Sequence, residues 1–204
     1  MLTAGGRITL GPVMPADFAP MFVWANDVAA ARLDLAYRPV DMKTHLQWCE
    51  GIGQDQSRVV FAIRQTGVAA IIGYMQVSGI NSVHRSAELG IRIGEERHRG
   101  QGYGKEALRL GLDYCWNHLN LNRVQLIAFK HNVRALRAYA AVGFKKEGVL
   151  RKAAFIDGGW TDIVVMGALR ASRKAARRGG RKPKLAIERK TESEPRPPTA
   201  IVAA

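Results

Sequence analysis

Three strand-like segments follow one another in the middle of this chain with no helix-like segment between them. Residues 58–64 and 68–77 are rich in apolar and β-branched residues and are separated by the turn sequence Gln65-Thr66-Gly67, and residues 86–93 form the third segment. Strands joined by tight turns pair antiparallel, whereas a doubly wound parallel sheet requires a helix after each strand. The order of segments therefore predicts an α+β fold with a mixed, largely antiparallel sheet.

Helix-like and strand-like patterns also flank this central region. Further strands are predicted at residues 8–13, 124–129, 144–150 and 161–169, the last two joined by a turn at residues 157–159. Helices are predicted at residues 15–25 with a bend or new start at Pro20, from a cap at Asp41 to Gly51, from Gly104 through Leu119, and at residues 135–142. In the helix after Asp41, Leu46 and Cys49 are expected to share the apolar side.

A change in composition near residue 170 divides the chain. Residues 170–204 contain eleven Lys and Arg residues against three Glu residues, which gives +8 of the total charge of +14, with four prolines and no aromatic residue. Such a segment buries too little apolar surface to offset the entropy lost on ordering it. We therefore expect a folded domain over residues 1–169 and a disordered basic tail over residues 170–204.

The composition also limits the class of protein. The chain has 204 residues, 47% of them hydrophobic, which is enough for one domain with a core. No apolar run approaches the roughly 18 residues of a membrane-spanning helix, and no signal-peptide pattern is present. Cys49 and Cys115 are far apart in the sequence and show no metal-binding spacing with histidines. We expect a soluble, cytoplasmic protein with neither a disulfide scaffold nor a metal site.

The run RHRGQGYGKEA at residues 97–107 lies between a predicted strand and a predicted helix. It contains three alternate glycines and three flanking cations, namely Gly100, Gly102, Gly104, Arg97, Arg99 and Lys105. Glycines let backbone N–H groups converge on an anion, and the start of a helix adds partial positive charge. The run has the composition of a phosphate-binding loop.

Two common phosphate-binding motifs do not match this run. A nucleoside-triphosphate loop would have Gly at position 99 and Ser or Thr at position 106, where this chain has Arg99 and Glu106. A dinucleotide fingerprint matches loosely from Gly102, but the acidic residue expected about 20 residues later is missing, and a polar stretch separates the motif from its strand. Another phosphate-bearing ligand has to be considered.

The run is similar to the acyl-coenzyme A signature of the GNAT superfamily of N-acetyltransferases, in the form Arg97-x-x-Gly100-x-Gly102. The strand sequence ELGIRIG at residues 88–94 resembles the splayed strand of that family, and the segment from Asn132 through Tyr139 to Phe144 resembles its second motif. Residues 147–162 are similar to the branch that includes ribosomal-protein, spermidine and amino-sugar N-acetyltransferases. The resemblance covers roughly residues 7–169 and implies a central sheet with a splayed strand, flanked by helices.

The resemblance implies acetyl-CoA as the acyl donor, with no metal. Backbone amides of the glycine loop would hold the diphosphate, the splayed strand would pair with the pantetheine arm, and Asn132 would hydrogen-bond the cofactor further along. The residues implied are Arg97, Arg99, Gly100, Gln101, Gly102, Tyr103, Gly104 and Lys105 in the loop, with Ile91, Arg92 and Ile93 in the strand. Ala135 stands where many relatives have Ser, so one hydroxyl contact to the cofactor is expected to be absent.

Direct attack of a primary amine on the thioester needs a base for the amine and an acid for the departing thiolate. The resemblance places Tyr139 beside the sulfur, and we expect Tyr139 to be the acid; the alternative is an aromatic residue that only packs a helix onto the sheet. Glu88 could accept the amine proton through water, with Asp157 and Asp162 as rivals. An ion-paired or solvated carboxylate remains the alternative for Glu88.

The acceptor is chosen in this superfamily mainly by the first two helices and nearby loops. Residues 1–57 contain six acidic and four basic residues, so this segment could attract a cationic amine in an otherwise positive chain. Trp24, Asn26, Trp48 and Asp157 are the candidate acceptor-binding residues, although both tryptophans could simply pack helices on the sheet. The acceptor could be a protein N-terminal amine or a small amine such as an amino sugar or polyamine, and a homodimer is compatible with the sequence.

The basic tail supports an alternative function. Its Lys and Arg residues could contact phosphates of RNA or of the ribosome, with the acetyltransferase-like body serving as a scaffold. The tail has no aromatic residue to stack on bases, which argues against sequence-specific recognition of single strands. A solubilising extension with no partner is the other explanation of the same residues.

Overall fold

A computed structural model describes residues 1–2, 6–33 and 37–171 of the chain. Its seven strands form one sheet in the order β1-β2-β3-β4-β5-β7-β6. The strands are β1 (Ile8–Gly11), β2 (Val59–Gln65), β3 (Ile71–Asn81), β4 (Ser86–Ile93), β5 (Arg123–Phe129), β6 (Lys145–Ile156) and β7 (Gly159–Leu169). All neighbours pair antiparallel except β4 and β5, which are parallel. The predicted α+β fold is confirmed.

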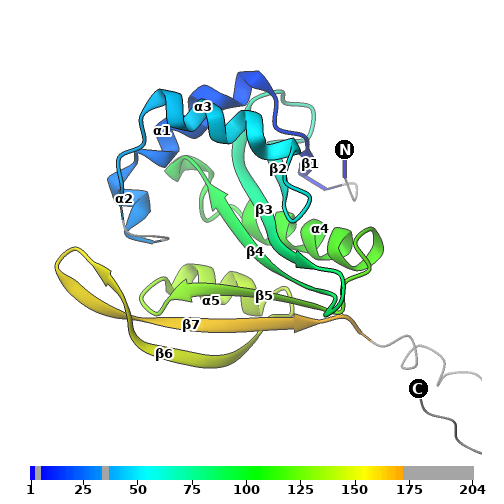
Figure 1. Ribbon diagram of the computed structural model, residues 1–204, viewed down its shortest axis with the longest axis vertical. Coiled ribbons are helices and arrows are strands. Elements are labelled where there is room, and N and C mark those ends of the chain that lie inside the picture. The colour runs from blue at the N-terminus through cyan, green and yellow to red at the C-terminus, as the bar shows by residue number, and fades with distance from the viewer. Residues whose placement is uncertain (3–5, 34–36, 172–204) are drawn as a thin grey trace, which may run out of the picture. The chain divides into compact units, whose positions relative to one another are not determined.

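Five α-helices flank this sheet in the described part of the chain (Figure 1). They are α1 (Phe18–Ala25), α2 (Val28–Ala31), α3 (Met42–Glu50), α4 (Tyr103–Asn117) and α5 (Val133–Ala140). Trp24 of α1 packs with Ala62 of β2 and Ile71 of β3 on one face, whereas Leu108 of α4 belongs to the larger core on the other face. Apolar helix faces on both sides therefore bury the central strands.

The helix after residue 41 was predicted with the correct ends but with one wrong core residue. Asp41 caps α3, since its Oδ1 accepts a hydrogen bond of 2.9 Å from the backbone N–H of Thr44. Leu46 is 37% exposed, however, while His45 is only 4% exposed. His45 and Cys49 are four residues apart and share the buried helix face, and Leu46 is rotated away from it.

The short helix α2 was not predicted. Asp27 caps it by accepting hydrogen bonds from the backbone N–H groups of Ala29 and Ala30. Four residues leave almost no apolar periodicity to detect, so the cap was the only available signal.

The strands β4 and β5 separate after a short region of pairing. They pair only from Ser86 to Glu88 of β4 and from Arg123 to Gln125 of β5. On its other edge, β4 stays paired with β3 as far as Ile93. Figure 1 shows β4 and β5 diverging beyond the paired region. The predicted splayed strand is confirmed, and it leaves one backbone edge of β4 without a strand partner.

Two strands differ most from their predicted ranges: β3 covers Ile71–Asn81 instead of residues 68–77, and β6 extends to Ile156, six residues beyond the predicted end at Leu150. The turn at residues 157–159 joins β6 to β7, with φ values of 48° at Asp157 and 79° at Gly158. None of the helices in the described ranges has the length and apolar character needed to cross a membrane. The predicted basic tail lies outside the described residues, apart from its first two positions.

Candidate active site

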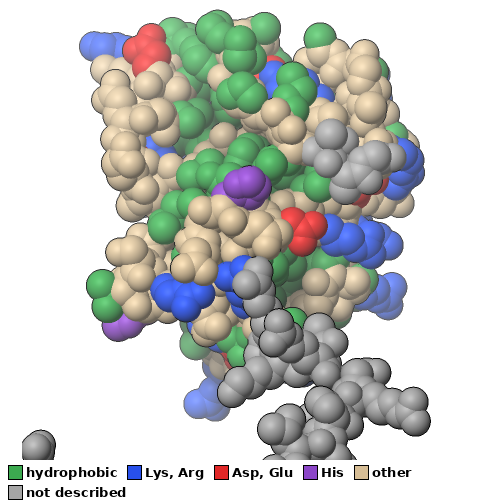
Figure 2. Space-filling view, turned by 90° about the vertical axis from the view of Figure 1, so that its right-hand side faces the viewer, with side chains coloured by type: hydrophobic (Ala, Val, Ile, Leu, Met, Phe, Trp, Pro, Cys, Tyr) green, Lys and Arg blue, Asp and Glu red, His purple; other side chains and the backbone are tan. Residues whose placement is uncertain are grey.

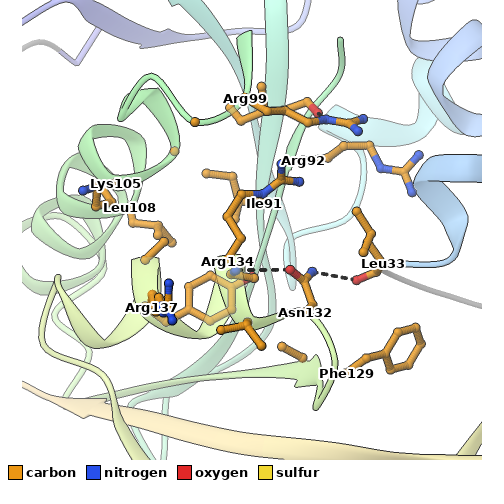
Figure 3. A pocket seen from close by; sticks show the side chains of 18 of the residues that line it. Leu33, Ile91, Arg92, Arg99, Lys105, Leu108, Phe129, Asn132, Arg134 and Arg137 are labelled. Carbon is orange, nitrogen blue, oxygen red and sulfur yellow. Dashed lines mark hydrogen bonds between the residues drawn. The ribbon is translucent and has the colours of Figure 1, made fainter. Parts of the chain in front are cut away.

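A cavity of about 520 Å³ lies where β4 and β5 diverge. Residues from both strands, the glycine loop, α4 and α5 form its walls (Figure 3). Its apolar lining includes Ile91 and Ile93 of β4 and Ile127 and Phe129 of β5. Ala30 of α2 and the following Leu33 border it as well. The loss of strand pairing therefore opens a space between the two strands that a ligand could enter.

The glycine loop forms one end of this cavity. Gly100, Gly102 and Gly104 line it, and the first two have φ values of 76° and 89°, which glycine adopts without strain. A Cβ atom on Gly100 would meet no other atom within 4 Å, so the backbone angle and not crowding requires glycine there. Gly102 caps α4 without a side chain, so the first-turn N–H groups of the helix are available to an anion.

Arg99 holds the loop against the end of β4. Its Nε donates to the carbonyl oxygen of Ile93 at 3.1 Å, and its Nη2 donates to that of Gly94 at 2.5 Å. The side chain also lines the cavity. Arg99 therefore fixes the loop geometry in addition to supplying charge.

Three of the predicted loop contacts do not line the cavity. Arg97 pairs with Glu95, Nε to Oε2, at 2.5 Å, and Gln101 donates to the carbonyl of Arg97. Tyr103 is buried, and its hydroxyl oxygen accepts a hydrogen bond of 2.7 Å from Gln65. The other predicted cofactor residues all line the cavity: Ile91, Arg92, Ile93, Arg99, Gly100, Gly102, Gly104, Lys105, Asn132 and Tyr139.

Tyr139 and Asn132 come from the second predicted motif. Tyr139 is only 8% exposed, lines the cavity, and packs against Phe144 with ring centroids 6.1 Å apart. Asn132 caps α5 by accepting a hydrogen bond from the N–H of Ala135 at 3.1 Å, and its Nδ2 donates to the carbonyl of Leu33 at 3.0 Å (Figure 3). Asn132 thus ties α5 to the segment after α2 as well as bordering the cavity.

The three candidate bases are not among the residues that line the cavity. Glu88 is exposed in the last residue pair before β4 and β5 diverge, and its Oε1 accepts a hydrogen bond of 2.7 Å from Gln125. Asp162 accepts hydrogen bonds from the Lys152 backbone N–H at 3.0 Å and from the Lys130 side chain at 2.9 Å, and these bonds lower its pKa. A proton from an acceptor amine in the cavity could reach Glu88 only through water.

Asp157, the third candidate, belongs to an exposed ion pair. Its Oδ2 lies 2.7 Å from Nε of Arg32, which links the β6–β7 turn to the segment after α2. His131 contacts the carbonyl of Arg32 at 2.9 Å, next to the Asn132 bond. Together these contacts hold the segment after α2 beside the cavity.

The other predicted acceptor residues serve packing and loop anchoring. Trp24 of α1 is only 5% exposed. Trp48 stacks on His45 with ring centroids 6.2 Å apart. Asn26 accepts from the backbone N–H of Val40 at 2.9 Å and donates to the Val40 carbonyl at 3.0 Å. None of the three lines the cavity, and their role in acceptor binding remains a prediction.

The charge of the cavity wall is entirely positive among the described residues. Five cationic residues line it, namely Arg92, Arg99, Lys105, Arg134 and Arg137, and no Asp or Glu does. On the face shown in Figure 2, Lys and Arg side chains also cover more area than acidic ones. Sequence reasoning missed Arg134 and Arg137, although their spacing of three residues on one helix face was a usable signal. The wall is suited to a polyanionic ligand.

His98 also lines the cavity, and its Nδ1 is buried without a hydrogen-bond partner among the described residues. No cluster of three or more His, Cys, Asp or Glu side chains in the described part of the chain could hold a metal ion.

A seven-stranded sheet with one splayed strand pair, a glycine loop before α4 and a cavity in the splay together define the N-acetyltransferase class of fold. The family model described as the acetyltransferase (GNAT) domain matches residues 7–145. The chain belongs to this family.

Individual relatives of this chain are also N-acetyltransferases. The spermidine N(1)-acetyltransferases of Vibrio cholerae and Escherichia coli K12 are each 37% identical to this chain, over 93 and 112 residues. These matches cover 46% and 55% of this chain and 53% and 59% of the relatives, so the chain spans little more than half of their length. A crystal structure of spermidine N-acetyltransferase from Vibrio cholerae in complex with CoA and spermine has a TM-score of 0.74 at 26% identity, covering 80% of this chain and 95% of that one.

Proposed function

We propose that this protein is an acetyl-CoA-dependent N-acetyltransferase acting on the primary amine of a small molecule, with polyamines as the first class to test. The observation that carries the proposal is the cavity in the splay, which has a glycine loop and cations at one end and the buried Tyr139 in its wall. The names of the relatives favour a polyamine over an amino sugar or a protein N-terminus. The net negative charge of residues 1–57 would favour a cationic acceptor.

In the proposed reaction, the amine nitrogen bonds to the thioester carbonyl carbon as the carbon–sulfur bond breaks. The acceptor ammonium first gives one proton to a base and becomes a free amine. Its second proton leaves the nitrogen as the amide forms and replaces the proton that the Tyr139 hydroxyl gives to the departing thiolate. The unpaired edge of β4 beyond Glu88 would hydrogen-bond the amides of the pantetheine arm. First-turn N–H groups of α4 would hold the diphosphate.

Substitution of Tyr139 tests the central step. Tyr139→Phe should lower kcat about 100-fold, since removal of a general acid typically costs 10²- to 10⁴-fold, while the Kd of acetyl-CoA changes little. Tyr114→Phe is the matched control, because Tyr114 stacks on His118 with centroids 5.3 Å apart and does not line the cavity. An unchanged kcat in Tyr139→Phe would make Tyr139 a packing residue.

A panel of amines identifies the acceptor. Spermidine, an amino sugar and a peptide with a free N-terminus would be compared by kcat/KM, using a thiol reagent to measure released CoA. Cys49 and Cys115 are both buried, and burial raises the pKa of Cys115 to about 12, so neither should contribute to the thiol signal. A higher kcat/KM for the peptide than for spermidine would overturn the polyamine assignment.

Glu88 is proposed as the base that acts through water. Glu88→Gln should lower kcat and shift the rate maximum to higher pH, because free amine must then form without help. Glu147→Gln is an exposed carboxylate control outside the cavity. Equal pH profiles for wild type and Glu88→Gln would leave Glu88 as a partner of Gln125 only.

The remaining sequence-based proposals concern location and partners. We propose a cytoplasmic, self-associating enzyme with a homodimer as its smallest form; a dodecameric structure is known for spermidine N-acetyltransferase from Vibrio cholerae. Light scattering of the purified chain tests this, and a monomer at all concentrations would contradict it.

RNA or ribosome binding by residues 170–204 stays an alternative, and RNA affinity unchanged on deletion of those residues would exclude it.

A further inference from the structure

Two arginines meet at the edge of the sheet opposite the cavity. The strands β4 and β5 are parallel and begin at the same edge, so Arg85 before β4 and Asn120 in the connection before β5 lie there together. The antiparallel strand β7 ends at this edge and is followed by Arg170 (Figure 1). Because each strand residue adds about 3.3 Å, the backbone of Arg85 lies roughly 20 Å from that of Ile91 in the cavity wall.

Hydrogen bonds to Asn120 hold the two guanidinium groups beside each other. Its Oδ1 accepts from Nη2 of Arg85 at 3.0 Å and from Nη1 of Arg170 at 2.9 Å, and its backbone carbonyl accepts from Nε of Arg85 at 2.8 Å. Backbone bonds join the same three segments: the Asn122 N–H donates to the Arg85 carbonyl at 2.7 Å, and the Arg170 N–H donates to the Asn122 carbonyl at 2.9 Å. Both arginines are therefore fixed in place by the folded domain itself.

This pair of arginines has no counter-charge in the described part of the chain. Neither Arg85 nor Arg170 forms an ion pair with a described carboxylate, as Arg64 and Arg123 do. Arg85 has a φ value of 52°, a left-handed conformation that residues other than Gly, Asn and Asp rarely adopt and that is enriched at functional sites. A guanidinium has five N–H donors, and the bonds to Asn120 use two of Arg85 and one of Arg170. The remaining donors and both charges are available to an anion.

We propose that Arg85 and Arg170 bind the phosphate backbone of a nucleic acid and so dock the protein on it. Guanidinium groups bind phosphate oxygens through paired hydrogen bonds. Arg85 and Asn120 are exposed, and neither they nor Arg170 line the cavity, so the site suits a polymer that runs across the surface better than a small anion that needs enclosure.

The sequence that follows Arg170 favours a nucleic acid as the partner. Residues 171–204 contain ten Lys and Arg residues against three Glu residues, so a net charge of +7 follows directly after the arginine pair. Several cations in a row release the counterions condensed on a nucleic acid, and this release supplies most of the affinity that does not depend on sequence. Neither the pair nor residues 171–204 contain an aromatic residue to stack on bases, so we expect contacts to phosphates and little base preference.

The distance between the two sites has a consequence for the enzyme. A nucleic acid bound at Arg85 and Arg170 would leave the cavity at the other end of β4 open. Polyamines are polycations and gather among the counterions of nucleic acids. Docking would therefore place the cavity where a polyamine is concentrated; this consequence rests on the proposed function, whereas the binding itself does not.

The test measures nucleic-acid affinity as a function of salt. Fluorescence anisotropy with a labelled oligouridine of about 20 nucleotides, longer than a single-strand site of roughly 4–16 nucleotides, would compare wild type, Arg85→Gln/Arg170→Gln and Lys43→Gln/Arg109→Gln. Lys43 and Arg109 are exposed on α3 and α4 and do not line the cavity, so this control removes the same charge elsewhere. All proteins keep residues 171–204, so the contribution of those residues is common to them.

We expect the Kd of wild type to rise steeply between about 50 and 200 mM salt. Each phosphate contact to a single strand contributes about 0.7 to the slope of log Kd against log salt, so the Arg85→Gln/Arg170→Gln variant should lose about 1.4 from this slope and bind about tenfold more weakly at the lower salt. The control should keep the wild-type slope. Arg85→Gln alone changes one exposed side chain and should lose about 0.7, which gives the same test if the double variant does not fold.

Three results would overturn the proposal. The first is no binding of oligouridine by wild type at the lower salt. The second is an equal change in the Arg85→Gln/Arg170→Gln variant and in the control, which would assign the binding to net charge or to residues 171–204. The third is binding of phosphatidylglycerol vesicles but not of oligouridine, which would assign the pair to a membrane surface. Equal affinity for an oligothymidine of the same length would support contacts to the backbone, since the 2′-hydroxyl distinguishes RNA from DNA.

The proposed acetyl transfer is tested separately by the release of CoA. Oligouridine binding without acetyl transfer would leave this inference standing and remove the proposed function. Acetyl transfer without oligouridine binding would do the reverse.

Discussion

The two parts of the sheet on either side of the splay differ in how they bury polar groups. In the part formed by β1 to β4, helices cover both faces, and the three buried polar side chains of the described residues, Asp17, His45 and Arg64, all belong to this part. In the part formed by β5 to β7, β6 has no fully buried residue, and its ion pairs are exposed. The cavity therefore lies between a part of the sheet with buried polar side chains and a part whose ion pairs are exposed to solvent.

The difference is clearest in two ion pairs of the same chemistry. Arg64 donates to Asp17, Nη2 to Oδ2, at 2.5 Å with both residues buried, and it also donates to the carbonyls of Pro12 and Ala69. Arg123 forms two hydrogen bonds to Glu147 across β5 and β6 with both side chains partly exposed. A lost partner costs much more where water cannot replace it, so equal substitutions should have unequal effects.

Removal of Asp17 should have the largest effect on stability. Asp17→Ala leaves Arg64 buried without a counter-charge and also removes an acceptor from the backbone N–H of Met14. The free energy of unfolding should fall by about 3–5 kcal/mol. Urea denaturation measures this, and Asp17→Asn, which keeps an acceptor of similar shape, should lose less. A loss below about 1 kcal/mol in Asp17→Ala would contradict the view of a sealed part.

A methyl group at the end of β4 should have the next largest effect. A Cβ atom on Gly94 would overlap the buried indole of Trp24, which packs against Ala62 and Ile71. Gly94→Ala should therefore cost about 1–3 kcal/mol through overpacking. Gly53→Ala is the control, since a Cβ atom there meets nothing within 4 Å. Equal melting temperatures for the two variants would show that Trp24 can move aside.

Removal of the cap on α5 should have a smaller effect on the free energy of unfolding. Asn132→Ala loses the bond to the N–H of Ala135 and the bond to the carbonyl of Leu33. The free energy of unfolding should fall by about 0.5–2 kcal/mol. Asn132→Asp keeps the cap acceptor but not the donor to Leu33, so recovery of stability in that variant would assign the loss to the cap.

The sequence was sufficient to predict the elements that depend on local patterns. The strand at residues 86–93 was predicted with the ends it has in the structure, and Asp41 and Gly51 mark the limits of α3. Hydrophobic alternation and cap residues are local signals, so they can be interpreted without knowing the partners. The splay and the placement of Tyr139 came from the family resemblance.

Long-range contacts were the part that the sequence could not supply. Trp24 and Asn26 were plausible acceptor residues, yet one is covered by the sheet packing and the other bonds a backbone 14 residues away. The spacing of Arg134 and Arg137 shows that they share one face of α5, but it does not show that this face borders the cavity. Which surface of a helix meets a cavity depends on tertiary packing, which hydrophobic spacing alone does not specify.

The exposed pair should give the smallest effect, and its sign depends on pH. The hydrogen bonds from Arg123 lower the pKa of Glu147, so the pair stabilises the folded state above the ordinary carboxyl pKa of about 4.3 and loses its contribution as the pH falls through the lowered value. Glu147→Gln should therefore lower the melting temperature slightly at pH 7, with the difference shrinking toward pH 3. Added salt should shrink it as well, because solvent ions screen an exposed pair. A decrease at pH 7 as large as that of Asp17→Ala would mean that β6 is sealed from water, and the contrast between the two parts of the sheet would be wrong.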